Sequence, residues 1–197
     1  MSHEAQELHS EEGHSVYYHN VGGKEPDGKP TRIGKWTFQT KMVRDVVISH
    51  LHGDVLNACA GKTRLEDYVR GPNILRNDKN PDVPATLHHD AQELDEHIDA
   101  ETFDVVVNDP PFDSGRADEL YAGMHASDYI DLRRTLGKLV KRGGLYIELG
   151  WNSWGMGDAD GWERVEHHIY RQPFKGDVHL VVDEKVNQQE LAGWGSP

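Results

Sequence analysis

Phe103-Asp104-Val105-Val106-Val107-Asn108-Asp109-Pro110-Pro111-Phe112 is the segment from which the architecture of this chain is best inferred. Its first five residues form an apolar run typical of a buried strand, and Asp109 to Phe112 follow where that strand ends. Prolines fix φ and have no N–H, so the backbone carbonyls there turn outward as acceptors. An acceptor side chain, two rigid prolines and an aromatic ring form a slot for a flat, amine-bearing ring. In an open α/β sheet, ligands bind beyond the carboxyl ends of the strands.

Strand and helix patterns alternate around this segment. Apolar residues at helical spacing predict helices over residues 41–51, which Gly53 ends, and 128–141, with a shorter helical stretch at 64–70. Strands are predicted at 54–58, 73–78, 85–90, 103–107 and 144–149, and a closing antiparallel hairpin at 164–171 and 177–186. Right-handed crossovers between these strands predict an α/β fold with a seven-stranded, mainly parallel sheet and helices on both faces.

The length of 197 residues predicts one domain with a full core. Residues 1–30 are rich in His, Glu, Gly and Pro, and we expect a flexible extension with room for one edge strand around Val16-Tyr17-Tyr18. Residues 31–190 are expected to form the domain, and residues 191–197 a tail.

The cysteine count and the hydropathy pattern favour a cytoplasmic protein that does not enter a membrane. The single cysteine, Cys59, excludes an internal disulfide and leaves too few thiols for a zinc finger. No apolar run approaches the length of a membrane span, and the first thirty residues lack a signal-peptide core.

The charge balance is strongly acidic, with 34 Asp and Glu against 21 Lys and Arg and a net charge of −13. Such a surface argues against DNA binding by phosphate neutralisation at ordinary salt. Either the chain never touches nucleic acid, or it works in a salt-rich cytosol where phosphate attraction is screened anyway. The acidity is Asp-rich, Lys-poor and spread along the chain, which favours the halophilic interpretation.

Small residues follow the first of the parallel strands, in Asn57-Ala58-Cys59-Ala60-Gly61-Lys62-Thr63. They let the backbone approach a ligand closely, and Gly61 permits a sharp turn. A phosphate-binding loop is excluded, because Leu56 stands where that motif requires glycine. The alternative interpretation is an ordinary tight turn between strand and helix.

Acidic residues follow the next two strands. Asp78 stands where a carboxylate can accept hydrogen bonds from both hydroxyls of a ribose, and Asp90, followed by Ala91, where one can accept an exocyclic adenine amine. Taken singly, Asp78 is more often a turn or helix-cap residue, and Asp90 is equally well explained as a helix N-cap. Independent coincidences at four successive strand ends are improbable, however, so the succession favours one ligand site along the edge of the sheet.

With these residues the chain resembles the class I S-adenosylmethionine-dependent amino-methyltransferases of nucleic-acid bases, from about Lys35 to Val186. Asp109-Pro110-Pro111-Phe112 is similar to the catalytic tetrapeptide of that family, Asp/Asn/Ser-Pro-Pro-Tyr/Phe/Trp. The resemblance implies a Rossmann-like methyltransferase fold, S-adenosylmethionine as cofactor and Asp109, Pro110, Pro111 and Phe112 as catalytic residues. It implies cofactor binding by Phe38, Thr40, Asn57, Ala58, Cys59, Gly61, Asp78, Asp90 and Ala91.

The chain departs from the family where Asn57 replaces an acidic residue and Thr63 a second glycine. Asn57 can accept from the cofactor ammonium, but more weakly than a carboxylate. Asp as the first residue of the tetrapeptide favours adenine N6, whereas in this resemblance Ser is commoner for cytosine N4 and Asn for RNA or protein amides. The alternatives are an RNA-base or protein-glutamine methyltransferase, and a catalytically silent binding subunit.

DNA is favoured over RNA as the partner, although few segments are left to read a target sequence. Only the loops at 113–127 and 150–162 and the N-terminal extension are available, so low specificity, a specificity subunit or a homodimer would follow. Trp151 and Trp154 in the second loop either cover the rim of the core or stack on nucleic acid.

Histidine pairs and a basic helix receive simpler interpretations. Neighbouring residues on a strand point to opposite faces, so neither His88-His89 nor His167-His168 predicts a metal site. The basic residues around the end of the second helix are interpreted as a solvated face; they are Arg133, Arg134, Lys138, Lys141 and Arg142.

Overall fold

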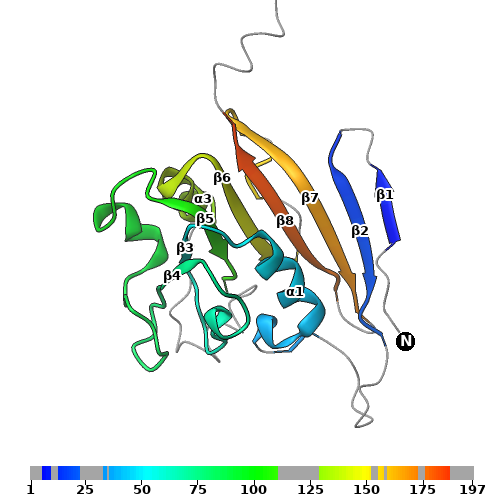
Figure 1. The fold of residues 1–197 in the computed structure, drawn as a ribbon, viewed down its shortest axis with the longest axis horizontal. Helices are drawn as coiled ribbons and strands as arrows, with labels where there is room; N and C mark the ends of the chain where they lie inside the picture. The colour runs from blue at the N-terminus through cyan, green and yellow to red at the C-terminus, as the bar shows by residue number, and fades with distance from the viewer. Residues whose placement is uncertain are drawn as a thin grey trace, which may run out of the picture.

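The computed structural model describes residues 6–9, 13–22, 33–34, 36–110, 129–151, 155–157, 159–172 and 176–186. Within these ranges the strands form one eight-stranded sheet in the order β1-β2-β7-β8-β6-β5-β3-β4 (Figure 1). The strands are β1 (Gln6–His9), β2 (Ser15–Asn20), β3 (Asp54–Asn57), β4 (Asn73–Arg76), β5 (Phe103–Asn108), β6 (Val140–Gly150), β7 (Trp162–Arg171) and β8 (Val178–Lys185).

The predicted fold class is confirmed. Strands β4, β3, β5 and β6 run parallel to one another, so their carboxyl ends lie along one edge of the sheet. Strand β8 is antiparallel to both β6 and β7, which gives the closing hairpin. The result is a Rossmann-like α/β sheet of the methyltransferase type, to which β1 and β2 add a further edge.

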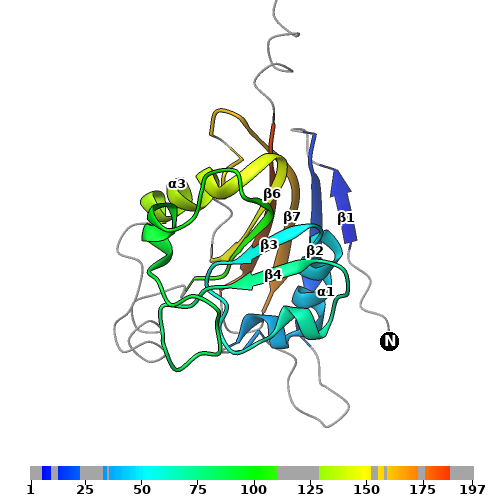
Figure 2. The same cartoon turned by 60° about the vertical axis from the view of Figure 1, so that its left-hand side comes forward.

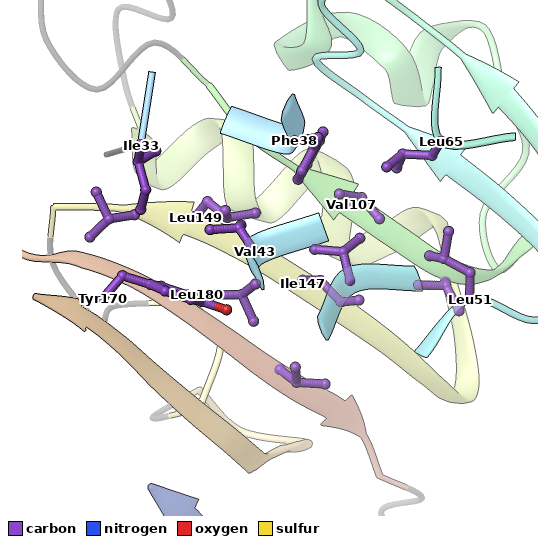
Figure 3. Close-up of a cluster of buried hydrophobic side chains, with 14 of the residues drawn as sticks. Ile33, Phe38, Val43, Leu51, Leu65, Val107, Ile147, Leu149, Tyr170 and Leu180 are labelled. Atoms are coloured by element: carbon purple, nitrogen blue, oxygen red, sulfur yellow. The ribbon is translucent and has the colours of Figure 1, made fainter. Parts of the chain in front are cut away.

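Helices cover both faces of the sheet, with α1 (Lys41–His50) on one side and α3 (Tyr129–Leu139) on the other (Figure 2). Side chains alternate between the faces along β5: Val105 and Val107 pack on the α1 side, and Val106 on the α3 side. Figure 3 shows the core on the α1 side, where Val43 of α1 lies over the strands. Each such fully buried aliphatic side chain contributes about 1.5–3 kcal/mol of stability.

Two predicted elements are shorter in the structure. The strand expected at 85–90 is reduced to one parallel bridge between Asn77 and Leu87. The reason is local, because the Asn77 side chain takes over: its Nδ2 donates to the His89 carbonyl and its Oδ1 accepts the His89 N–H. The helical stretch expected at 64–70 is a single 3-10 turn, η2 (Leu65–Asp67), in which only Leu65 is buried.

Helix α1 lies where it was predicted but ends before Gly53. Its last residue is His50, and Leu51 is the C-cap. Gly53 has φ +58 and forms the turn into β3, where a Cβ would lie 2.1 Å from Asp104 Oδ2. None of the helices in the described ranges is both long enough and apolar enough to span a membrane.

In the N-terminal region, β2 lies where the sequence left room for one edge strand around Val16-Tyr17-Tyr18, and β1 adds a second strand. Strand β2 pairs in parallel with the outer edge of β7, and β1 pairs antiparallel with β2. Stacked rings hold this seam, with Tyr17 4.6 Å from His168 and His19 4.4 Å from Tyr170 between ring centroids. Composition alone suggested a loose segment because these contacts join residues far apart in the chain.

The His167-His168 pair points to opposite faces of β7, as predicted. His167 Nε2 lies 2.8 Å from His179 Nδ1 on one face. On the other face, His168 Nδ1 lies 2.9 Å from His19 Nε2, and His168 Nε2 lies 2.8 Å from Glu166 Oε2. The second group extends to α1, because Glu166 also contacts His50 Nε2 at 3.1 Å.

These contacts predict that the fold loses stability as the pH falls below about 6.5. Burial, with the charge of His168, lowers the pKa of His19 to about 4, and burial, with His179, lowers the pKa of His167 to about 4. Between pH 6.5 and 4 the unfolded chain therefore binds more protons than the fold. Each of these two histidines contributes a slope of at most about 1.4 kcal/mol per pH unit.

Glu166 extends the same loss to lower pH. Hydrogen bonds from His168 and His50 lower its pKa to about 2, so its contribution disappears as the pH falls from about 4.5 towards 2. Urea unfolding midpoints should therefore be level from pH 8 to 7 and fall steadily from pH 6.5 to 4.5. Replacing His19 by Asn should flatten part of that slope. A midpoint that is constant from pH 7 to 5 would contradict the buried, neutral histidines.

Candidate active site at the carboxyl edge of the sheet

The loop after β3, Asn57–Gly61, is tied to the strands on both sides of it. Ala58 N donates to Val107 O of β5 at 2.9 Å, and Ala60 N donates to Asn77 O, just after β4, at 2.9 Å. The backbone of this loop is therefore fixed by its neighbours before any ligand arrives.

Gly61 makes the sharp turn that the sequence predicts, with φ +56. Its N–H donates to Asp78 Oδ2 at 2.8 Å, and its carbonyl accepts from Arg76 Nη2 at 2.8 Å. The Trp36 ring lies against it, since a Cβ at Gly61 would be 3.1 Å from Trp36 Cε3. Trp36 was not singled out from the sequence, and it brings the segment before α1 to the loop.

The Asn57 side chain places buried polar atoms at the carboxyl end of β3. It is 0% exposed, and neither Nδ2 nor Oδ1 has a hydrogen-bond partner among the described residues. Thr63 Oγ1, at the other end of the turn, is buried and unpaired in the same sense. Buried polar groups are nearly always paired, so one donor and one acceptor at a strand's carboxyl end suit a ligand that carries both kinds of group.

Asp78 is only 2% exposed and is engaged by the backbone. Besides Gly61 N on Oδ2, its Oδ1 accepts Asn80 N at 2.9 Å. Burial raises the pKa of Asp78, although the two N–H donors oppose that shift. Asp78 therefore fastens the loop, and any contact with a ribose would have to use the lone pairs that remain.

Replacing Asp78 by Asn should destabilise the fold and loosen the loop. The amide has one acceptor oxygen, so it cannot serve both Gly61 N–H and Asn80 N–H, and one buried donor is left unpaired. The expected loss is about 1–3 kcal/mol in the free energy of unfolding. Urea denaturation measures it, with the exposed Asp82→Asn as the matched control. Equal stability of the two variants would show that the carboxylate is not the loop's anchor.

Asp90 is the N-cap of the 3-10 helix η3 (Ala91–Glu96), as one of its two interpretations predicts. Its Oδ1 accepts Gln92 N at 3.1 Å, and its Oδ2 pairs with Lys79 Nζ at 2.5 Å. Ala91 is buried beneath it in the core on the α3 side. A ligand that used the Asp90 carboxylate would compete with Lys79.

Asp109 and Pro110 follow the last residue of β5 directly, the first half-buried and the second buried. Pro111 and Phe112 lie outside the described residues. We call the segment that begins with Asp109-Pro110 the elbow. Cys59 connects it to the loop after β3, because Cys59 Sγ donates to Asn108 Oδ1 at 3.8 Å. Burial raises the pKa of the Cys59 thiol well above its usual range, and the carboxylates of Asp78, Asp109, Asp90 and Glu148 add to the effect. The structure therefore brings Cys59, Asp78, Asp90 and Asp109 to one edge, as predicted.

Phe38 and Thr40 lie beside this edge, between the loop and α1. The Phe38 ring is buried in the core on the α1 side, and its carbonyl accepts from Arg44 Nη1 at 3.1 Å (Figure 3). Thr40 is the N-cap residue of α1, and its carbonyl accepts the N–H groups of Val43 and Arg44. A cofactor would meet the backbone of this segment and not the Phe38 ring.

A buried polar network lies beneath the elbow and was not predicted from the sequence. Arg133, interpreted as part of a solvated face, turns inward from α3 to Glu148 on β6, whereas Arg134 and Lys138 are exposed. Tyr146 and Asn108 complete the network. The signal was present in the sequence, because Glu148 is the one charged residue in the segment 143–150 of its strand. Predicting its partner required the register of β5 on β6 and the rotation of α3.

A pocket of about 440 Å³ lies away from the carboxyl edge, between α3 and the segment that leads into β7. Trp162 and Met156 form its apolar side, and Arg134, Lys138 and Lys185 also line it. Trp151, just beyond β6, is 51% exposed. Trp154 lies outside the described residues.

Solved structures with a similar fold include proteins named as methyltransferases. The 1,6-didemethyltoxoflavin-N1-methyltransferase of Burkholderia thailandensis, which holds 1,6-didemethyltoxoflavin and S-adenosylhomocysteine, is 14% identical with a TM-score of 0.57, over 75% of this chain and 78% of that one. TrmN from Thermus thermophilus is 15% identical with a TM-score of 0.54, over 78% of this chain and 50% of that one. At these identities the likeness shows the fold. No protein-family model and no curated protein matches the chain.

Proposed function

We propose that the protein transfers a methyl group from S-adenosylmethionine to an exocyclic amine of a nucleic-acid base, with adenine N6 in DNA as the favoured acceptor. The observation that carries the proposal is the juxtaposition of Asp109-Pro110 and the Asn57–Gly61 loop at the carboxyl edge of the sheet. The S-adenosylhomocysteine held by the Burkholderia enzyme of the same fold supports the choice of cofactor.

The residues present suit the amino-acid end of S-adenosylmethionine. Asn57 Oδ1 would accept from the ammonium, and Asn57 Nδ2 and Thr63 Oγ1 would donate to the carboxylate, which satisfies the buried atoms that lack partners. Gly61 leaves room for close approach of the backbone, and Asp78 holds that turn in place. Cys59 and Asp90 would line the remainder of the cofactor site.

The elbow would bind and orient the amine. An exocyclic base amine is a poor nucleophile because its lone pair is delocalised into the ring. Asp109 Oδ and the Pro110 carbonyl would accept its two N–H groups and favour a pyramidal nitrogen, while Phe112 would stack on the base and Pro111 would stiffen the turn. S-adenosylmethionine supplies the electrophilic methyl group on its sulfonium. The methyl carbon would pass from sulfur to nitrogen and leave S-adenosylhomocysteine, and Asp109 or water would accept the amine proton.

The charge of the edge fits a cationic cofactor better than it fits an anionic polymer. The carboxylates of Asp78, Asp90, Asp109 and Glu148 all raise the pKa of the Cys59 thiol, so all four lie around Cys59. They would attract the ammonium and the sulfonium, and they would repel nucleic-acid phosphates at low salt. High potassium chloride screens that repulsion. The rate of methyl transfer to nucleic acid should therefore rise with salt, whereas the affinity for S-adenosylmethionine should change little.

A catalytically silent binding subunit is the second candidate. The observation in its favour is that Asp78 and Asp90, two predicted cofactor residues, are already engaged by backbone N–H groups and by Lys79. Such a protein would keep the fold and bind a partner without transferring methyl groups.

Two measurements test the proposal. Isothermal titration with S-adenosylmethionine at low and high potassium chloride should give binding in the micromolar range or tighter, with Asn57→Leu as the weakened control. Tritium transfer to unmethylated DNA, RNA and protein, followed by nucleoside analysis, should then give N6-methyladenine in DNA. Tritium in RNA or in protein glutamine would identify that macromolecule, in place of DNA, as the substrate. Cofactor binding without any methyl transfer would favour the silent binding subunit. Absence of cofactor binding would refute the proposal.

A further inference from the structure

We propose that Glu148 is a positioning residue that holds Asn108, and through it the catalytic elbow at Asp109, with Arg133 and Tyr146 as its supports. The inference rests on the proposed function and assigns a role to a buried charge that the transfer step itself does not use. It separates the residue that touches the substrate, Asp109, from the residues that keep it in place.

The network joins three elements, α3, β6 and β5, and ends at Asn108 on β5. Asn108 Nδ2 on β5 donates to Tyr146 Oη at 2.9 Å and to Glu148 Oε2 at 3.3 Å, both on β6. Tyr146 Oη in turn donates to Glu148 Oε2 at 2.7 Å. Arg133 of α3 grips the carboxylate from the far side, with Nε 2.9 Å from Oε2 and Nη2 2.5 Å from Oε1. The result is a continuous chain of donors and acceptors from α3 to the end of β5.

The protonation states agree with this direction of donation. Burial raises the pKa of Tyr146 well above its usual range, and the Glu148 carboxylate raises it further, so the phenol keeps its proton. Although burial alone would lower the pKa of Arg133, its hydrogen bonds to Glu148 raise it above the ordinary value. Tyr146 is thus a donor to Glu148 and an acceptor for Asn108.

The burial of this ion pair is hard to explain by stability alone. Glu148 is 5% exposed and the Arg133 side chain 12%. Removing two charges from water costs several kcal/mol per ion, and apolar residues of similar size often serve a core as well or better. A buried pair that also fixes the amide of Asn108 supplies a defined orientation, which packing alone would not.

Asn108 is placed to pass that orientation on to both halves of the site. It is fully buried and is bonded directly to Asp109 through the peptide link. Its Oδ1 accepts from Cys59 Sγ at 3.8 Å, so the same amide also touches the loop after β3. In-line methyl transfer depends on the distance between amine and methyl, and a misplacement of about 1 Å can cost about 10²-fold in rate.

The chain contains a matched control for a purely structural role. Arg164 and Asp183 form a second buried pair on the same face of the sheet, with exposures of 15% and 0% and Arg164 Nε 2.9 Å from Asp183 Oδ1. That pair joins β7 to β8 and holds the N–H of Met156. Asp183 lies opposite Tyr146 in the sheet, but β6 separates its strand from β5 and Asn108. The Arg164–Asp183 pair shares burial and charge type with the Arg133–Glu148 pair, but Asp183 accepts from Arg164 and Met156 N, whereas Glu148 accepts from Arg133, Tyr146 and Asn108.

The test compares Glu148→Gln with Asp183→Asn in the full chain. In Glu148→Gln one carboxylate oxygen becomes an N–H₂ group, which faces donors in either orientation: the Arg133 guanidinium on one side, or Tyr146 Oη and Asn108 Nδ2 on the other. The network that holds Asn108 therefore loosens. We expect kcat to fall by about 10–10²-fold in Glu148→Gln, with the dissociation constant of S-adenosylmethionine within about twofold of wild type. In Arg133→Lys, which keeps the positive charge, kcat should fall by less than in Glu148→Gln. Asp183→Asn should lose stability and keep kcat within about twofold.

Hydrogen exchange of the segment 103–110 gives a readout that does not depend on activity. Exchange there should be faster in Glu148→Gln and unchanged in Asp183→Asn. Unchanged kcat and exchange in Glu148→Gln would overturn the inference while leaving the proposed function intact, as would equal loss of kcat in the two variants. If the wild-type chain transfers no methyl group to DNA, RNA or protein, the proposed function fails and the positioning role fails with it.

Discussion

Asp109→Ala should lower methyl transfer by about 10²–10³-fold while S-adenosylmethionine still binds. In the proposed mechanism the carboxylate accepts from the amine where positive charge develops, and its loss would leave the Pro110 carbonyl as the acceptor. Asp109 is half-buried at the end of β5, so truncation opens no large cavity in the core. Single-turnover transfer to DNA, measured at saturating cofactor, gives the effect on chemistry without the effect on binding.

Asp109→Asn separates the charge of this residue from its shape. The amide keeps one acceptor oxygen and loses the negative charge, so its transfer rate should lie between those of wild type and Asp109→Ala. Isothermal titration on each variant should give the same cofactor affinity within a few-fold. Full transfer activity in Asp109→Ala would remove the elbow from the mechanism, and unchanged chemistry with weakened cofactor binding would move Asp109 to the cofactor side.

The strand ends could be predicted from the sequence because their signals are local. The run of β-branched residues before Asp109 predicts a buried strand, and the structure has β5 there, at Phe103–Asn108. Helix α1 follows equally from the spacing of its apolar residues and covers Lys41–His50. Once these strands are parallel, the order of segments along the chain places Asn57, Asp78 and Asp109 on one edge. Their roles there remain proposals.

Other features depend on contacts between distant residues, which no local pattern reveals. The parallel pairing of β2 with β7 joins His19 to His168, 149 positions apart. The third strand is lost to side-chain bonds from Asn77, which compete with the ladder. Arg133 looked like its exposed neighbours because helical charge patterns do not say which member turns inward. The sequence signal for a buried partner was Glu148, the one charged residue in the segment 143–150 of β6.

Asp183→Ala should cost about 3–5 kcal/mol in the free energy of unfolding. It would leave the Arg164 guanidinium, 15% exposed, without its buried carboxylate and would remove the acceptor of Met156 N–H. Against a typical total of about 5–15 kcal/mol, that loss brings the fold close to its limit at 37 °C. Chemical denaturation of the purified chain, at the salt concentration that stabilises it best, measures the change.

The double variant Arg164→Met with Asp183→Leu provides the decisive comparison. Replacing both members of a buried pair by apolar residues removes the uncompensated charge, so most of the lost stability should return, apart from about 1–3 kcal/mol for the unpaired Met156 N–H. The coupling between the two sites should then exceed about 1 kcal/mol in a double-mutant cycle. Additive losses, with the double variant less stable than either single one, would mean that the pair is not held together as the geometry indicates. In that event the Gly155-Met156-Gly157 turn, where a Cβ at Gly155 would lie 2.2 Å from Asp183 Oδ2, would owe its position to packing and not to this carboxylate.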